Sequence, residues 1–254
     1  MNLKALLLLP LVAILLTSCS HVYTPALYHQ DIAYQPKPAS FDSVKVANYV
    51  SAGFNAYSNT DLSDGLESGQ VNLSRAYVFK GFNLAYGAFG VAGDYQNAAA
   101  QGQPNYFTDK FFGAVGGRAS ANLFVTSGRA DIRFIGVEVA YSHEFGSYAD
   151  FRQSVASSPD YYVDSRTDLY TVGLTSEVLF HARNNNDFQN GIRVFLGTTF
   201  GRYDLDDSYF LNQASTDSFL HKLFPKASYF IKFKNYFGTV EVGSQFFIRL
   251  GLKF

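Results

Sequence analysis

The chain has 254 residues, with 20 Lys or Arg against 21 Asp or Glu and a formal net charge of −1 at pH 7. This near-neutral balance argues against nucleic acid as a partner. Charged residues make up 16% of the chain, against about 25% in ordinary soluble proteins, whereas aromatic residues reach 17% without any Trp. This composition is more typical of a membrane barrel than of a water-soluble domain.

Residues 1–18 have the features of a secretory signal peptide. Lys4 supplies the basic n-region, and an apolar run from Leu6 to Leu16 follows it. That run is too short to cross a bilayer as a helix, but it has the length of a signal h-region. We therefore predict that residues 1–18 are removed from the mature protein.

The segment from Leu16 to Cys19, Leu-Thr-Ser-Cys, resembles the lipobox of bacterial lipoproteins. In that family the cysteine thiol receives a diacylglycerol, the chain is cut before the cysteine, and the new amino terminus is acylated with a fatty acid such as palmitate. The resemblance implies lipidation of Cys19 and a partnership with lipoprotein-maturation machinery. Several acyl chains on one residue give stable membrane anchoring. The alternative is an ordinary signal peptide followed by a chance cysteine, which as the only one in the chain cannot form an internal disulfide.

Residues 19–43 contain prolines at 25, 36 and 38 and show no sustained period. This pattern predicts an extended linker rather than a folded unit. We expect residues 19–43 to form a lipidated tether that packs on the end of the domain that follows.

Residues 44–254 are predicted to form one domain of alternating strands with turn signals between them. Many of these strands are long enough for the ~9–11 residues that cross a membrane. Their connections alternate between long polar loops and short turns, as in outer-membrane barrels. The predicted fold is an all-β, antiparallel up-and-down transmembrane β-barrel of about 8–10 strands. The predicted strands are 44–57, 70–80, 82–96, 110–124, 131–145, 167–182, 190–204, 219–234 and 238–254.

The number of predicted strands is odd, whereas single-chain bacterial barrels normally have an even number. A lipidated terminus and a terminal Phe254 that both lie on the periplasmic side also require an even number. We therefore expect either that the stretch 227–254 merges two strands or that 44–57 is not a barrel strand.

Alternation of apolar and polar residues does not by itself say which face of a strand lies inside the barrel. A lipid-anchored, lipocalin-like soluble barrel that carries an apolar ligand would also alternate, with its apolar residues inward. The polar faces here consist mostly of Gly, Ala, Ser and Thr with about one charge per strand. This favours a narrow lumen and an apolar exterior in lipid. Aromatic residues near strand ends fit interfacial girdles: Phe111, Phe112, Tyr141, Phe145, Tyr170, Phe180 and Tyr229.

On this assignment a set of charged side chains points into the lumen. Isolated charges there would be costly, whereas mixed signs can pair. A salt-bridged plug is therefore the preferred prediction, and a polar track for a solute or proton is the alternative. The outward position of Arg75, on an otherwise apolar face, has no explanation in the sequence. The predicted luminal charges are Arg118, Glu138, Glu177, Arg193, Lys232, Glu241 and Arg249.

The sequence predicts no catalytic residue, cofactor or metal. His143 lies between Ser142 and Glu144, but adjacent residues in a strand point to opposite faces and cannot form a triad. No nucleophile, zinc or phosphate-binding motif occurs. An acidic cluster at 204–207 could bind Ca²⁺, but such a cluster is more often a solvated loop.

The last fifteen residues read as one long strand with an apolar face that ends in Phe254. This strand resembles the C-terminal strand of outer-membrane barrels, in which the assembly machinery recognises a terminal aromatic residue. We therefore expect Phe254 to act as an assembly signal and the barrel-assembly machinery to be a partner.

The whole pattern resembles small, lipobox-bearing outer-membrane β-barrel proteins of the Bacteroidota. This resemblance implies an outer-membrane location among membrane lipids, but no activity. Lipoproteins exported to the surface in that phylum tend to carry acidic residues just after the cysteine, whereas the first acidic residue after Cys19 is Asp31. We therefore expect a periplasm-facing anchor in the inner leaflet.

The expected role is structural or interactive and non-enzymatic, with long loops that bind a surface glycan or protein. An outer-membrane lipid-modifying enzyme is a further alternative.

Overall fold

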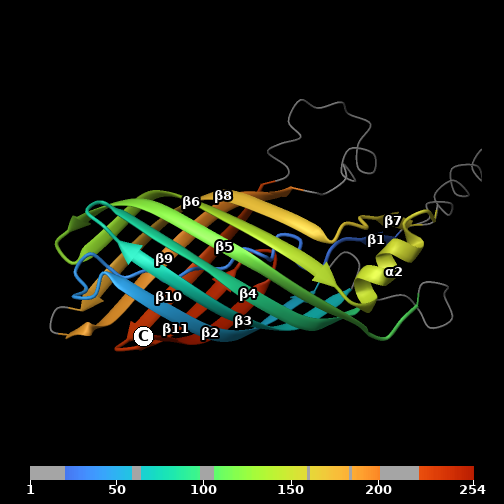
Figure 1. Ribbon diagram of the computed structural model, residues 1–254, viewed down its shortest axis with the longest axis horizontal. Coiled ribbons are helices and arrows are strands. Elements are labelled where there is room, and N and C mark those ends of the chain that lie inside the picture. The colour runs from blue at the N-terminus through green and yellow to red at the C-terminus, as the bar shows by residue number, and fades with distance from the viewer. Residues whose placement is uncertain (1–20, 59–63, 98–105, 159–160, 183–184, 201–222) are drawn as a thin grey trace, which may run out of the picture.

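The computed structural model describes residues 21–58, 64–97, 106–158, 161–182, 185–200 and 223–254. Ten long antiparallel strands close into a barrel in which strands that follow one another in the wall pair, and the last pairs with the first (Figure 1). The predicted fold class is confirmed. The wall strands are β2 (Val46–Ser58), β3 (Gly65–Val78), β4 (Phe82–Gln96), β5 (Lys110–Ser127), β6 (Ala130–Phe145), β8 (Asp168–Ala182), β9 (Asn185–Phe200), β10 (Phe224–Phe233), β11 (Tyr236–Val242) and β12 (Phe246–Lys253).

Three further elements lie outside the wall. The short strands β1 (His21–Tyr23) and β7 (Tyr161–Val163) pair in parallel, and the helix α2 (Ser147–Val155) follows β6. Figure 1 shows all three together beyond one end of the barrel. In the described part of the chain, no helix is both long and apolar enough to cross a membrane.

The predicted strand 238–254 is two strands, β11 and β12, joined by residues 243–245. Val242 pairs with Phe246 across this turn, and paired residues share a face. These two residues lie four positions apart, which is an even number. The alternation of inward and outward residues therefore continues through the turn, so the turn cannot be recognised from the alternation. The suspicion that 227–254 merges two strands was therefore correct.

The alternative suspicion, that 44–57 is not a barrel strand, was wrong. Strand β2 pairs with β3 on one side and with β12 on the other, and so closes the barrel. Beyond the end of β12, the N–H and C=O groups of Phe254 both bond to the backbone of Asn48 at 2.9 Å. The chain end therefore completes the seam.

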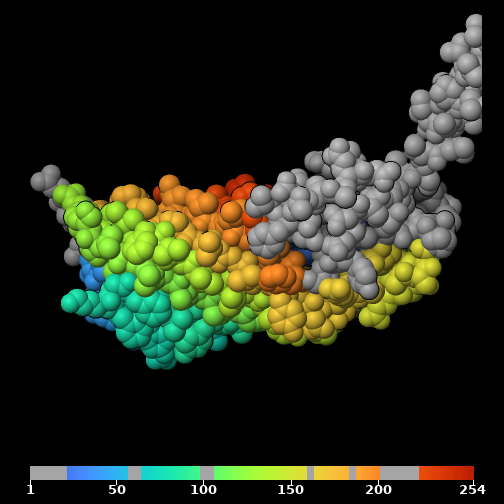
Figure 2. Space-filling model, turned by 90° about the horizontal axis from the view of Figure 1, so that it is seen from above, coloured from blue at the N-terminus to red at the C-terminus, as the bar shows by residue number. Residues whose placement is uncertain are grey.

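The two ends of the barrel differ in their connections. One end, here called the short-turn end, carries the connections at 79–81, 128–129, 183–184 and 234–235 and the chain end at Phe254 (left in Figure 1). The other, the long-loop end, carries the connections at 59–64, 97–109, 146–167, 201–223 and 243–245. Figure 2 shows the region around α2, in yellow, projecting beyond the wall at the long-loop end.

Apolar side chains point out of the barrel and polar side chains point in. On β9, for example, Ile192, Val194 and Leu196 are 46–56% exposed, whereas Arg193 is 1% exposed. Six of the seven aromatic residues expected in girdles are exposed, but Phe112 is fully buried and faces the lumen. The apolar faces therefore cover the outside of the barrel, in the opposite sense to a soluble barrel.

Candidate functional site in the barrel lumen

Residues 24–42, here called the luminal segment, run along the inside of the barrel. Every residue from 30 to 39 is buried. The segment bonds to side chains of β5, β6, β8, β10, β11 and β12, which only a position inside the closed wall allows. Figure 1 shows this stretch, in blue, entering from β1 and emerging at the opposite end. Residues 24–42 of the expected tether therefore run inside the barrel and do not pack on its end.

At the long-loop end the segment is tied to α2 and to the parallel pair. The Tyr148 hydroxyl donates to the carbonyl of Thr24 at 2.8 Å. The buried carboxylate of Glu144 on β6 accepts from the N–H of Ala26 at 2.6 Å and pairs with Arg152 of α2 at 2.5 Å. Glu144 thus joins the wall, the helix and the segment.

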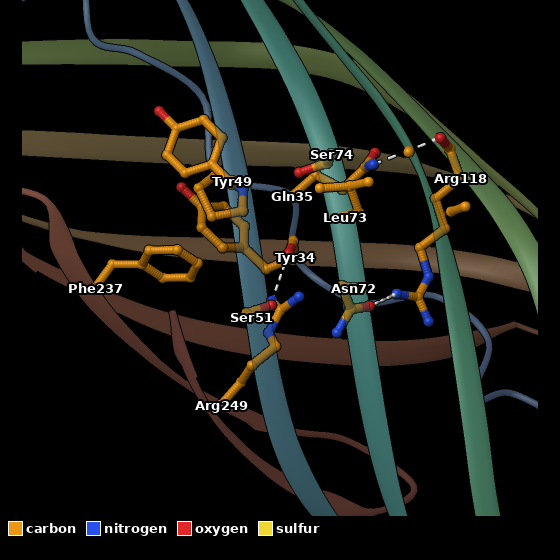
Figure 3. A pocket seen from close by; sticks show the side chains of 13 residues that line it. Tyr34, Gln35, Tyr49, Ser51, Asn72, Leu73, Ser74, Arg118, Phe237 and Arg249 are labelled. Carbon is orange, nitrogen blue, oxygen red and sulfur yellow. Dashed lines mark hydrogen bonds between the residues drawn. The ribbon is translucent and has the colours of Figure 1, made fainter. Parts of the chain in front are cut away.

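Near the middle of the lumen, Tyr34 bonds to three wall strands. Its N–H donates to Glu241 on β11 at 3.0 Å, and its hydroxyl donates to Glu177 on β8. Its carbonyl accepts from Arg249 on β12, as the dashed line in Figure 3 marks. Tyr34 is only 1% exposed, so all of these bonds lie away from bulk water.

Several wall cations donate to carbonyl groups of the segment. Arg118 donates to the carbonyl of Asp31, and Lys226 donates to that of Ile32 at 2.6 Å. Arg133 donates to the carbonyl of Pro38 at 3.0 Å. These carbonyl groups lie outside any sheet, so the wall cations supply the hydrogen bonds that a neighbouring strand would otherwise supply.

At the short-turn end, two aspartates flank the point where the segment leaves the lumen. Asp131 on β6 accepts from the N–H of Ser40 at 2.5 Å. Asp42 lies between Lys232 at 3.4 Å and Lys253 at 3.2 Å. Both ends of the segment are therefore fixed, at opposite ends of the barrel.

The seven charges predicted for the lumen are 1–7% exposed and face inward. Four of them form one group: Arg193 pairs with Glu138 and lies 3.8 Å from Glu241, which also pairs with Arg249 at 3.1 Å. The other three have partners outside the predicted set. Glu177 pairs with Arg133, Lys232 with Asp42, and Arg118 bonds to Asn72 and to the luminal segment.

Sequence reasoning missed Arg133 because of a β-bulge in β6. Strict alternation counted back from Ile135 and Val137 puts Arg133 on the outward face, yet it is fully buried. The pairing register shifts between Arg133 and Gly136, and both Phe134 and Ile135 point outward. One extra residue in a strand reverses the faces beyond it. Asp31, Lys37 and Asp42 were not predicted as luminal charges for another reason. They lie in the predicted linker, and nothing in the composition of that linker indicates that it runs inside the barrel.

An apolar cluster lies in the lumen near the long loops, beside the ion pair of Glu144 and Arg152. Tyr23 and Leu27 of the amino-terminal region pack there against inward side chains of β4, β5 and β8 and against α2. The wall and helix residues in this cluster include Phe89, Val91, Tyr95, Phe112, Tyr148 and Leu169. This cluster places packed side chains inside the barrel near its long-loop end.

A cavity between Tyr34, Gln35 and the β2–β4 wall, with Ser51 and Asn72 on its wall side, is shown in Figure 3. It has room for about one water molecule. An apolar ligand of ordinary size does not fit there.

The remaining predicted positions lie outside the lumen or outside the described residues. Arg75 faces outward near the short-turn end, 5.5 Å from the ring centre of Tyr77, whose hydroxyl lies 3.4 Å from that of Tyr86. A long cationic side chain among interfacial aromatics can extend its charge to the membrane surface. Cys19 and the acidic cluster at 204–207 fall outside the described residues.

His143 is separated from its sequence neighbours, as strand alternation predicts. It faces outward and its Nδ1 lies 3.0 Å from Asp168, whereas Ser142 and Glu144 are buried in the lumen. Among the described residues, no group of three or more His, Cys, Asp or Glu side chains could hold a metal ion.

No known protein-family model matches the chain, and no curated protein matches it. Three similar solved structures are bacterial. The transport unit of the autotransporter AIDA-I from Escherichia coli is 8% identical, with 86% of this chain and 92% of that chain covered and a TM-score of 0.41. An outer-membrane channel from Pseudomonas putida F1 is 9% identical, with 87% and 100% covered and a TM-score of 0.37. The outer-membrane protein OprG from Pseudomonas aeruginosa is 13% identical, with 83% and 97% covered and a TM-score of 0.34. Likenesses this low carry no argument, so the functional conclusion depends on the lumen's own geometry.

Proposed function

We propose that the protein is an outer-membrane β-barrel lipoprotein with a closed lumen and a structural or surface-interaction role. One observation carries this proposal: an apolar wall surrounds a lumen that the chain's own amino-terminal segment occupies. The lipid is attached at Cys19, as the lipobox resemblance implies. The long loops bind the partner, a surface glycan or protein.

The outward face supports a place in lipid. Exposed apolar side chains cover the wall on successive strands, including Leu174 on β8, Val194 on β9 and Ile248 on β12, at 45–56% exposure. In water, an apolar surface of this extent would drive association. In a bilayer it is stable, because every wall strand bonds to two neighbours and no sheet edge remains. Closed barrels of this kind belong to outer membranes.

The occupied lumen supports a closed barrel rather than a pore. An aqueous channel needs about 16 strands, whereas this wall has ten. The luminal segment and the apolar cluster at the long-loop end fill the inside that remains. The charged groups are bonded to one another and to the segment, which favours the salt-bridged plug over a continuous polar track.

The orientation of the described side chains does not favour the alternative of a lipocalin-like carrier. That function requires apolar side chains inward around a ligand cavity. The apolar side chains point outward, and the cavity beside the luminal segment takes about one water molecule. No arrangement among the described residues supports the lipid-modifying enzyme, so we retain the structural or interactive role.

Electrophoretic mobility and conductance test the membrane barrel and its closure. We expect protein purified from the outer membrane to run faster in SDS when unboiled, because a folded barrel resists SDS. In planar bilayers we expect no steady conductance. A regular open-channel conductance would contradict the closed lumen. An unchanged mobility together with detergent-free solubility of Cys19→Ala would contradict the membrane barrel.

Lipidation and partner binding need separate tests. Metabolic labelling with a palmitate analogue should mark the wild type and leave Cys19→Ala unmarked. For the interactive role, replacing residues 153–158, which are mostly exposed, with a Gly/Ser segment of equal length should abolish capture of a surface glycan or protein while the SDS mobility shift is kept. Unchanged capture across such loop replacements would contradict an interactive role for the loops.

A further inference from the structure

The luminal segment carries the chain from one end of the barrel to the other before the wall begins. Strand β1, which directly precedes the segment, pairs in parallel with β7 at the long-loop end. The other end of the segment bonds to Asp131, next to the turn at 128–129, and to Lys253, beside the chain end. The amino-terminal exit and the carboxyl terminus therefore lie on opposite sides of the barrel.

The length of the segment agrees with such a crossing. Residues 23 and 40 are separated by 17 peptide units, which span at most about 60 Å when extended. The hydrocarbon core of a bilayer is about 30 Å thick. The chain can therefore cross the membrane inside the barrel with length to spare for its contacts at both ends.

The exit at the long-loop end is held by specific contacts. The N–H of Asp164 donates to the carbonyl of Tyr23 at 2.9 Å, and Tyr148 donates to that of Thr24 at 2.8 Å. Tyr23 itself is fully buried in the apolar cluster with Leu27. For residue 21 to leave at the short-turn end instead, the chain would have to break these contacts and turn back through a filled lumen.

We propose that the protein is anchored in the outer leaflet, with its amino terminus at the cell surface and its wall folded around the chain that leads there. Outer-membrane barrels place their long loops outside and their short turns in the periplasm. Two peptide units separate Cys19 from His21 and span at most about 7 Å, so Cys19 leaves the barrel on the same side as residue 21. This inference rests on the proposed lipoprotein function, and it reverses the expectation of a periplasm-facing anchor.

The even number of strands expected from the sequence is confirmed, but it does not decide on which side the amino terminus lies. Ten strands do bring residues 46 and 253 to the same end of the barrel. The luminal segment then adds one more crossing, which moves residue 21 to the other end. An even number of strands is therefore compatible with a lipid anchor on the surface.

Single-cysteine labelling tests this topology. The thiol of Cys19 is blocked when acylated, so each variant offers one new thiol. We would compare His21→Cys with two exposed positions, Ser157→Cys at the long-loop end and Arg129→Cys at the short-turn end, using a membrane-impermeant polyethylene-glycol maleimide. In intact cells we expect His21→Cys and Ser157→Cys to shift in mass, and Arg129→Cys to shift only after the outer membrane is permeabilised.

The opposite pattern would overturn the proposal: labelling of His21→Cys only after permeabilisation, together with Arg129→Cys. If His21→Cys reacts in neither case, an epitope inserted between residues 20 and 21 decides by antibody binding to intact or permeabilised cells. Membrane fractionation, the SDS mobility shift and palmitate labelling are measured on the same variants. Failure of those readouts would contradict the proposed function, whereas their success with a periplasmic residue 21 would contradict only this topology.

Discussion

The guanidinium of Arg249 donates a hydrogen bond to the backbone carbonyl of Tyr34, 215 residues earlier in the chain. The last wall strand is thus bonded to a segment that precedes the first. Strand β12 also pairs with β2 to close the barrel. Closing the wall and filling the lumen are therefore coupled, because the same strand completes both.

The hydroxyl of Tyr34 should contribute measurably to stability. Tyr34→Phe removes its bond to the buried carboxylate of Glu177 and leaves the ion pair between Glu177 and Arg133. A hydrogen bond to a charged group contributes about 1.5–3 kcal/mol. We expect the free energy of unfolding, measured by urea titration in detergent micelles, to fall by about that amount. The outward Tyr86→Phe is the matched control, with a change within about 0.5 kcal/mol.

Loss of charge at Glu241 should destabilise the protein more strongly. Glu241→Gln leaves Arg249 and Arg193 short of a buried counter-charge. Removing one partner of a buried ion pair costs about 3–5 kcal/mol. We expect a lower temperature for loss of the fast-migrating SDS form, with the exposed Glu67→Gln unchanged. Equal temperatures for both variants would contradict a structural role for the group.

Replacing the luminal segment should open the barrel. A Gly/Ser linker of equal length in place of residues 26–42 removes the contacts to Arg118, Lys226 and Glu241. The unsatisfied wall charges should then draw water into the lumen. We expect discrete conductance steps in planar bilayers that are absent from the wild type. A Gly/Ser replacement of 98–105 is the control, and a closed barrel after the 26–42 replacement would show that the segment does not block the lumen.

Stability should depend on pH through Asp42. Burial by itself raises the pKa of Asp42, but the ammonium groups of Lys232 and Lys253 outweigh it, so the pKa lies below its usual value. The unfolded chain takes up this proton near pH 3.9, before the native state does. The contribution is therefore complete above about pH 5 and is lost as pH falls through the folded-state pKa.

Unfolding at pH 7 and at pH 3 checks this dependence. Asp42→Asn should be less stable than the wild type at pH 7, and the difference between the two should shrink at pH 3. A difference that stays constant across this range would mean that Asp42 acts through packing and not through its charge.

A disulfide should form between β1 and β7. Tyr23 is the parallel neighbour of Val163, and adjacent strands lie about 4.8 Å apart. That spacing is within the range that a disulfide bridges. Oxidation of the Tyr23→Cys, Val163→Cys double variant should change its mobility in non-reducing gels. The pair Tyr23→Cys, Arg129→Cys joins opposite ends of the barrel and should not cross-link; a cross-link there would contradict the course of the luminal segment.

The barrel wall could be predicted from the sequence because strand alternation is a local property. The outward faces of β9 and β12 follow from period two alone. Two errors came from local irregularities that period two does not reveal. The turn at 243–245 preserves the parity of its flanking strands, and the bulge before Gly136 reverses the parity of β6.

The sequence by itself determined an antiparallel barrel with apolar residues outside and paired charges inside, because each strand shows its own inward and outward faces. Only the tertiary structure decided what fills the lumen and at which end the amino terminus leaves it. Residues 24–42 have no period, and their place depends on partners such as Glu144, Glu241 and Arg249, more than a hundred residues away. Such long-range bonds form only when the wall has closed around the segment, so no local pattern in the sequence predicts them.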